Sequence, residues 1–231
     1  MARSYKICVL KNFESAKFSA SPYFFDDQMH FEEVDRPPTT SIRVGGDSIA
    51  VEGFSKYILE HEVEEKVTGR IYAQNFSAYI RKGLIDVFPN TKRALVLLSG
   101  KKKDVLDFCR KDKKISEFKF NTIKIDMKKL LTLLSNVKGV WFSFNAGQIT
   151  SSALMGHNVQ GTPDFKHFKQ LGDISTLSFH FEFDRTLHPI MVTEDGTVVT
   201  QAKYQERTEE INLVLAIKKE LLNPVLEEIK K

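Results

Sequence analysis

One short segment carries three side chains whose types and spacing suit catalysis. Residues 179–184 read Phe-His-Phe-Glu-Phe-Asp, and successive side chains of a β-strand point to opposite faces. The phenylalanines then share one face, and His180, Glu182 and Asp184 share the other. An imidazole beside two carboxylates can act as a general base with an electrostatic partner, as in a nuclease-like hydrolase, or can bind a divalent metal.

Geometry weighs against a single reactive site on this strand. Same-face neighbours lie ~7 Å apart because each residue rises ~3.3 Å, so one ion would not reach all three side chains without strand curvature. An antiparallel strand with one solvent-exposed face produces the same alternation. We therefore favour a solvent-exposed sheet face, and keep His180, Glu182 and Asp184 as candidate catalytic residues.

A lysine-rich stretch supplies the second candidate site. Seven of the fourteen residues from 101 to 114 are basic, and three aspartates leave a local charge of +4. The basic residues are Lys101, Lys102, Lys103, Arg110, Lys111, Lys113 and Lys114. Such a cluster attracts polyanions, and lysine favours loose phosphate contacts over bidentate reading of bases. A lysine-rich solvated helix face would give the same sequence.

The start of this stretch is similar to a phosphate-binding turn. Ser99, Gly100 and Lys101 follow an apolar run and open a helix, a position where backbone N–H groups suit an anion. The upstream glycine of a nucleotide-binding loop is missing, and Lys102 stands where a hydroxyl is required. The turn is thus expected to contact a nucleic-acid phosphate rather than to hydrolyse a nucleotide.

Other motifs of catalysis and metal binding are missing from the sequence. It has no Gly-x-Ser-x-Gly elbow and no Gly-x-Gly-x-x-Gly loop. His157, Asp164 and His167 are spaced more widely than a typical metal motif. Cys8 and Cys109 each fall in an apolar pattern, which predicts reduced core thiols. We expect neither a metal nor a cofactor.

A polar loop offers a third, weaker site. A strand that bears Trp141 is followed by residues 146–152, which are mostly small and polar. Open α/β sheets place ligands at the carboxyl ends of their strands. By this analogy with a fold class, the loop predicts a small-molecule sensor.

The elements that position these residues are predicted from the spacing of apolar side chains. Apolar residues at helical spacing predict a helix over 76–88 that Pro89 ends. Strands and helices then alternate in the order strand 94–99, helix 104–113, strand 118–125, a helix capped by Asp126, and strand 140–144. This alternation across 66–145 predicts β-α units in a mixed sheet.

The last third of the chain has a different pattern. Residues 175–202 contain three alternating runs, with Asp195-Gly196 as a hairpin turn, which predicts an antiparallel meander. The apolar stripe of residues 206–229 predicts a long C-terminal helix, kinked or restarted at Pro224. The lower half of this helix is a candidate for homodimer formation. The fold class expected is α+β or α/β.

Composition sets the limits of these interpretations. The chain has 231 residues with 42% hydrophobic and 28% charged residues, typical of a folded protein. We expect a β-rich or irregular segment at 1–65 packed on a main domain at 66–231. With a net charge of +4 and no long apolar run, the chain is expected to be cytoplasmic and not associated with membranes.

Three functions follow from these patterns. The first is a non-catalytic binding module, with a subunit of a larger assembly as one form of it, whose lysine-rich face engages a nucleic-acid phosphate backbone or an acidic protein partner. The second is a hydrolase or nuclease that uses the His180 strand. The third is a small-molecule sensor. We favour the first because the sequence lacks a motif of catalysis.

Overall fold

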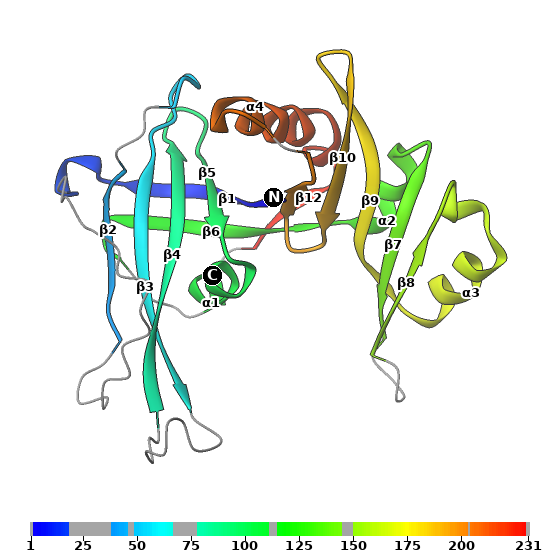
Figure 1. Ribbon diagram of the computed structural model, residues 1–231, viewed down its shortest axis with the longest axis horizontal. Helices are drawn as coiled ribbons and strands as arrows, with labels where there is room; N and C mark the ends of the chain where they lie inside the picture. Colours follow the sequence, from blue (N-terminus) through cyan, green and yellow to red (C-terminus); the bar gives the residue numbers. More distant parts are fainter. Residues whose placement is uncertain are drawn as a thin grey trace. The chain divides into compact units, whose positions relative to one another are not determined.

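The computed structural model describes residues 2–18, 38–45, 49–66, 78–110, 115–144, 150–202 and 204–229, with the side chains of 65, 66 and 78–80 left out. Within these ranges the chain is mostly antiparallel β-sheet with four short α-helices (Figure 1). It divides into two compact units. Unit 1 contains Met1–Val9, Ala50–Glu52 and Asn121–Lys231, and unit 2 contains Leu10–Ile49 and Gly53–Phe120. The expected boundary between 65 and 66 stays a prediction.

Unit 1 is built on an antiparallel sheet in the order β1-β11-β10-β9-β7-β8. Beside this order, β12 pairs with β6. The strands are β1 (Arg3–Phe13), of which residues 3–9 belong here, β6 (Phe118–Ile125), of which 121–125 belong here, β7 (Val137–Ser143), β8 (Ser151–Met155), β9 (Asp173–Phe183), β10 (Thr186–Thr193), β11 (Thr197–Thr200) and β12 (Leu226–Ile229).

The helices of unit 1 pack on one face of this sheet. They are α2 (Met127–Leu133), α3 (Pro163–Leu171) and α4 (Arg207–Ile217), with a 3-10 turn at Val159–Gly161 and a π-helical turn at Lys218–Leu222. Both α2 and α4 contact β9, and Phe165 of α3 lies 5.8 Å from Phe142 between ring centroids. Side chains of the covered face are buried, for example Val140, Leu177 and Phe179. Burial of this apolar face is the main stabilising term of unit 1.

Unit 2 is a smaller antiparallel sheet in the order β2-β3-β4-β5-β1. Its strands are β2 (Thr40–Val44), β3 (Tyr57–Lys66), β4 (Ala78–Asn90), β5 (Leu95–Gly100) and residues 10–13 of β1. Helix α1 (Lys102–Arg110) contacts β3, β4 and β5, and a 3-10 turn lies at Ser15–Lys17. Alternate residues of β3 and β4 are buried, such as Leu59 and Ile85, which pair directly.

The expectation of β-α units across 66–145 is wrong. Most of the segment predicted as a helix, 76–88, lies in β4, which pairs through residues 78–87 with β3 and through residues 85–90 with β5. The apolar residues of this segment fit a helical spacing, but Gly83, Ile85 and Val87 also alternate and are the buried side. Pro89 lies inside the strand opposite Val96 rather than ending a helix. Long-range pairing with two strands outweighed local helical periodicity.

The expectation of a long C-terminal helix is also wrong. The helix begins at Arg207, changes to π-helical geometry at Lys218 and ends at Leu222. Pro224 lacks the N–H that a continuing helix needs. The chain then turns and Leu226–Ile229 pairs antiparallel with Thr122–Ile125 of β6. Ile229, predicted as part of a helical stripe, is therefore a strand residue.

Several local predictions agree with the structure. The strand expected over 118–125 is β6 with the same bounds, and Asp126 caps α2 by accepting a hydrogen bond from the Lys129 amide at 3.0 Å. The three strands expected within 175–202 are present as the antiparallel strands β9, β10 and β11. Cys8 and Cys109 are buried free thiols. Among the described helices, none has the length and apolar character needed to cross a membrane.

Candidate functional site

Three consecutive lysines lie at the amino end of helix α1. Strand β5 ends at Gly100 and α1 begins at Lys102, so the strand–turn–helix order expected here is present. Lys101, Lys102 and Lys103 are all exposed, and so is Arg110 at the last residue of the helix. Lys103 and Arg110 are seven residues apart, which places them on the same side of α1. Lys111, Lys113 and Lys114 lie outside the described residues.

Helix α1 also carries two aspartates, Asp104 and Asp107. Arg81 of β4 pairs with both carboxylates. Arg81 donates to the buried carboxylate of Asp104, and its second terminal nitrogen lies 3.4 Å from the Asp107 carboxylate. Gly83 makes this arrangement possible. A Cβ atom at Gly83 would lie 2.6 Å from Asp104 Cγ, closer than atoms can approach. Arg81 supplies one positive charge against these two carboxylates, so it offsets part of the negative charge beside the lysines.

The three candidate catalytic residues do not share one strand face. His180 and Glu182 are exposed on β9, as expected. Asp184 lies beyond the strand, in the two-residue turn Asp184-Arg185 that joins β9 to β10. Both turn residues have positive φ, 49° and 62°, as the tightest hairpin turns require. The structure therefore brings His180 and Glu182 together on one face and places Asp184 in the turn beyond them.

A hollow of about 330 Å³ lies beside His180 and Glu182. Its other lining residues come from the end of α2, the segment after it, the start of β7, strands β9 and β10, and the π-helical turn. They are Leu133, Leu134, Ser135, Asn136, Lys138, Phe179, Phe181, Leu187 and Leu221. Six of the eleven lining residues are apolar, and the other five are polar or charged, among them His180, Glu182 and Lys138. Lys138 is engaged elsewhere, since its Nζ lies 2.7 Å from His157 Nδ1.

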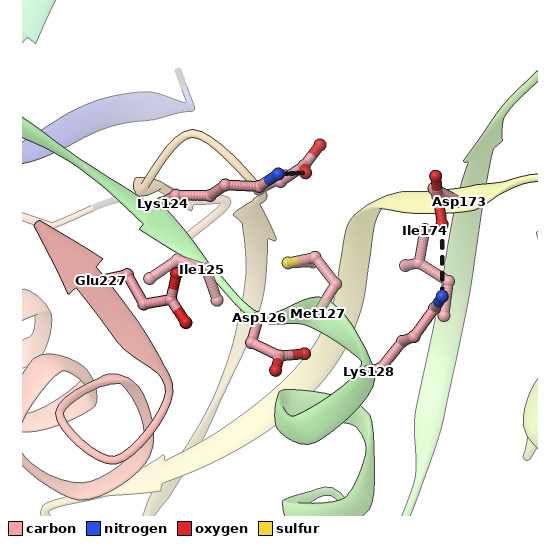
Figure 2. Close-up of a pocket in the computed structure, with 9 residues that line it drawn as sticks. Lys124, Ile125, Asp126, Met127, Lys128, Asp173, Ile174 and Glu227 are labelled. Atoms are coloured by element: carbon pink, nitrogen blue, oxygen red, sulfur yellow. Dashed lines mark ion pairs between the residues drawn. The ribbon is translucent and has the colours of Figure 1, made fainter. Parts of the chain in front are cut away.

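A second hollow in unit 1 has a charged rim (Figure 2). Lys124 pairs with Glu194 at 2.9 Å and Lys128 pairs with Asp173 at 3.3 Å. The hydrogen bond from Lys124 to Glu194, together with the attraction between the two charges, raises the pKa of the Lys124 ammonium. Lys124, Lys128 and Asp173 are largely exposed and Glu194 is partly exposed, so these pairs contribute little to stability.

A buried polar cluster in unit 1 has no counterpart in the sequence-based expectations. The Glu210 carboxylate of α4 accepts hydrogen bonds from Tyr5, Arg3 and Thr200, and Arg207 donates to the Tyr5 hydroxyl at 3.1 Å. Burial raises the pKa of Tyr5, and the adjoining Glu210 carboxylate raises it further. In the sequence Glu210 ends the polar run Glu206 to Glu210, so no local pattern marked it as the buried residue that it is.

Positions expected for other ligands are only partly described. Trp141 is half-buried on β7, and its ring lies over Gly139, where an added Cβ would be 3.0 Å from Trp141 Cζ3. Residues 145–149 of the polar loop expected to bind a small molecule lie outside the described residues. Across the described part of the chain, no group of three or more His, Cys, Asp or Glu side chains is arranged to hold a metal ion.

Sequence comparisons give no relatives: no protein-family model matches the chain, and no curated protein matches it.

Proposed function

We propose that this chain is a non-catalytic binding protein that engages the phosphate backbone of a nucleic acid through the amino end of α1. The observation that carries the proposal is that Lys101, Lys102 and Lys103 are exposed at the amino end of α1, while Asp104 and Asp107 both pair with Arg81. Three adjacent exposed cations attract a polyanion. Arg110 extends the same side of the helix.

The position of the lysines supports a binding role over a stabilising one. The amino end of a helix carries a partial positive charge, so each exposed cation there costs roughly 0.3–1 kcal/mol of helix stability. The amino end of an α-helix presents backbone N–H groups that have no partner within the helix, and such groups favour a bound anion. The lysines therefore lower the stability of the free helix, and a bound phosphate offsets this cost.

The expected binding is tolerant of base sequence and sensitive to salt. Lysine acts as a flexible point charge, which contacts phosphates without reading base edges. If Lys101, Lys102, Lys103 and Arg110 each neutralise one phosphate, log K should fall with log salt with a slope of about −3. The affinity should therefore be lost by a few hundred millimolar salt.

Fluorescence anisotropy with labelled single-stranded RNA, single-stranded DNA and duplex DNA tests this proposal. The triple variant Lys101→Glu, Lys102→Glu, Lys103→Glu should weaken binding at least tenfold and flatten the salt dependence. A matched control changes three exposed lysines of unit 1 in the same way, Lys166→Glu, Lys169→Glu and Lys219→Glu. The control should keep the affinity of the unmodified protein within about twofold.

Three outcomes would contradict the proposal. They are binding that does not depend on salt, an equal loss in both triple variants, and no binding at low salt. Tighter binding of polyglutamate than of nucleic acid would move the assignment to an acidic protein partner. Self-association through the C-terminal segment stays a prediction, which the mass of the protein in solution tests.

The hydrolase alternative rests on His180 and Glu182 alone, because Asp184 lies in the turn. Cleavage of RNA or DNA in the presence of Mg²⁺ or Mn²⁺, abolished by His180→Ala and Glu182→Ala in a folded protein, would favour it over binding without catalysis.

A further inference from the structure

Strand β9 borders the hollow of about 330 Å³ and extends past the start of its neighbour β7. β7 begins at Val137, which pairs with Phe179. That pair places the Asn136 carbonyl against the His180 N–H, so the residue before β7 still covers His180. Beyond this point, no described strand pairs with β9 on the side away from β10.

The hairpin after β9 shows which way the Glu182 backbone points. Phe183 and Thr186 flank a two-residue turn, and such a flanking pair exchanges hydrogen bonds between its strands. Because the bonding side alternates along an antiparallel strand, Phe181 also bonds toward β10, whereas the N–H and C=O of Glu182 point away from it. Among the described residues, none has a backbone hydrogen bond to Glu182 on this side. Glu182 therefore presents a donor and an acceptor next to each other.

The hollow has an apolar wall on the side of the helices. Phe179 and Phe181 are buried on the face of β9 that the helices of unit 1 cover. Leu133 and Leu134, at the end of α2, and Leu221 of the π-helical turn line the same hollow. Leu133 is 48% exposed, so an apolar ligand here would remove leucine surface from water, which is favourable.

The charge of the lining comes chiefly from Glu182. Its carboxylate is the one acidic group that lines the hollow, and within the described part of the chain it makes neither an ion pair nor a hydrogen bond. Lys138, the one lysine of the lining, has its Nζ atom 2.7 Å from His157 Nδ1. A carboxylate without a cationic partner repels a ligand that is itself an acid.

We propose that this hollow binds a small, flat heteroaromatic amine in which a ring nitrogen lies next to an amino group. The ring nitrogen accepts a hydrogen bond from the Glu182 N–H, and the amino group donates one to the Glu182 carbonyl oxygen. The body of the ring system packs on Phe181, Leu133 and Leu221. Ligand sites commonly combine an apolar lining with a few polar groups that fix orientation, in volumes of about 300–1,000 Å³.

A single open residue fixes the kind of occupant. It offers two adjacent hydrogen bonds, which orient a ring but do not hold a peptide strand, whose bonds recur at every second residue. A ring with only a donor or only an acceptor would leave one of the two Glu182 backbone groups without a partner when water is displaced. This inference is independent of the proposed nucleic-acid function, which uses α1 of unit 2, and it gives His180 no catalytic role.

The test titrates 2-aminoquinoxaline into the full chain labelled with ¹⁵N and follows the amide resonances by NMR. The Glu182 amide should move downfield and saturate, because its N–H gains an acceptor. Three matched probes define the recognition. They are 6-aminoquinoxaline, whose amino group is far from a ring nitrogen, 2-methylquinoxaline, which lacks the donor, and quinoxaline-2-carboxylate, which is an acid. 2-Aminoquinoxaline should bind at least fivefold more tightly than each of them.

Variants of the protein locate the binding. Leu133→Asp should weaken binding of 2-aminoquinoxaline at least fivefold, whereas Leu171→Asp, which changes a leucine of α3 that is 59% exposed, should leave it unchanged. Glu182→Pro removes the N–H that faces the hollow, and a strand edge tolerates proline where the N–H does not serve the ladder. It should bind at least fivefold more weakly than Glu182→Gln, which loses the carboxylate but keeps the N–H. Circular dichroism confirms that each variant is folded.

The proposal is overturned by any of three results. The first is the absence of a saturable shift of the Glu182 amide at millimolar 2-aminoquinoxaline. The second is equal affinity for 6-aminoquinoxaline or 2-methylquinoxaline, a comparison that uses only the unmodified protein. The third is an equal effect of Leu133→Asp and Leu171→Asp.

Discussion

The Tyr5 hydroxyl donates a hydrogen bond of 2.7 Å to the carboxylate of Glu210, which is 205 residues away in the sequence. Tyr5 is at the start of β1 and Glu210 is in α4, and both side chains are buried. Arg3 lies 3.0 Å from the same carboxylate oxygen. The pair joins the first strand of the chain to its last α-helix within unit 1.

Replacement of Tyr5 by phenylalanine should lower the free energy of unfolding by about 1–2 kcal/mol. The change removes a hydrogen bond to a charged group and leaves a buried carboxylate oxygen less satisfied. Urea unfolding measures the effect. Tyr57→Phe is the matched control, because Tyr57 is also buried and has no described hydroxyl hydrogen bond. Equal destabilisation by the two variants would contradict the role assigned to Glu210.

Alkaline pH should destabilise the protein through Tyr5 and Tyr204. Burial, followed by the charges of Glu210 and Glu209, raises the pKa of Tyr204 to about 12, and the pKa of Tyr5 is raised as well. An unfolded tyrosine titrates near pH ~10, so the folded state retains these protons longer. Their contribution is complete below pH ~10 and is lost as the pH rises toward the folded-state values.

Unfolding measured in urea between pH 9 and pH 12 checks this direction. The variant Tyr204→Phe should show a shallower fall of stability over this range than the unmodified protein. If the two profiles coincide, the raised pKa of Tyr204 does not contribute to the loss of stability at alkaline pH. The hydroxyl of Tyr204 lies 2.7 Å from His188 Nδ1, so the neutral-pH stability of the variant is measured as a separate baseline.

Asp195→Asn should destabilise unit 1 and reduce its sensitivity to acid. Burial alone would raise the pKa of Asp195, but the Lys6 ammonium 3.2 Å away and hydrogen bonds from Thr193, Lys6 and Thr197 lower it overall. The lowered pKa gives stability that is present above the unfolded value of ~3.9 and is lost as the pH falls through the folded value.

The size of the Asp195→Asn effect follows from the exposure of the pair. Lys6 is buried, and it keeps a hydrogen bond of 2.6 Å to the Asp195 carbonyl oxygen in the variant. The Asp195 side chain is 41% exposed, so solvent weakens the ion pair. We expect a loss of about 1–2 kcal/mol at pH 7. A loss that is equally large at pH 2 would contradict the assignment to the ionised carboxylate.

Gly83→Ala should lower the stability of unit 2 by about 1–3 kcal/mol. The added Cβ would meet the Asp104 carboxyl group and displace it from Arg81, and overpacking of this kind costs stability. Gly161→Ala is the control, because a Cβ there would be 3.4 Å from Asn158 Nδ2, an ordinary contact. Thermal unfolding compares the two variants. A Gly83→Ala protein as stable as its parent would show that Asp104 can move at no cost.

Local sequence patterns were sufficient to predict the strands, caps and turns that do not depend on residues far away in the chain. The alternation of residues 118–125, the Asp126 cap of α2 and the Asp195-Gly196 turn follow from side-chain period, capping chemistry and turn preference. The exposed lysines before α1 and the exposed His180 and Glu182 were also evident from the spacing of residues. Each of these features is set by a few neighbouring residues.

Some segments have an apolar spacing that fits both a helix and a strand, and for these the long-range contacts determine which of the two forms. Residues 78–90 suit a helix by spacing, and they form β4 because strands on both sides supply backbone partners. Residues 226–229 leave the C-terminal helix because β6 offers an edge to pair with. The buried Glu210 cluster likewise needs residues far apart in the chain. Backbone pairing and burial act across such distances, and local periodicity does not encode which partners will be present.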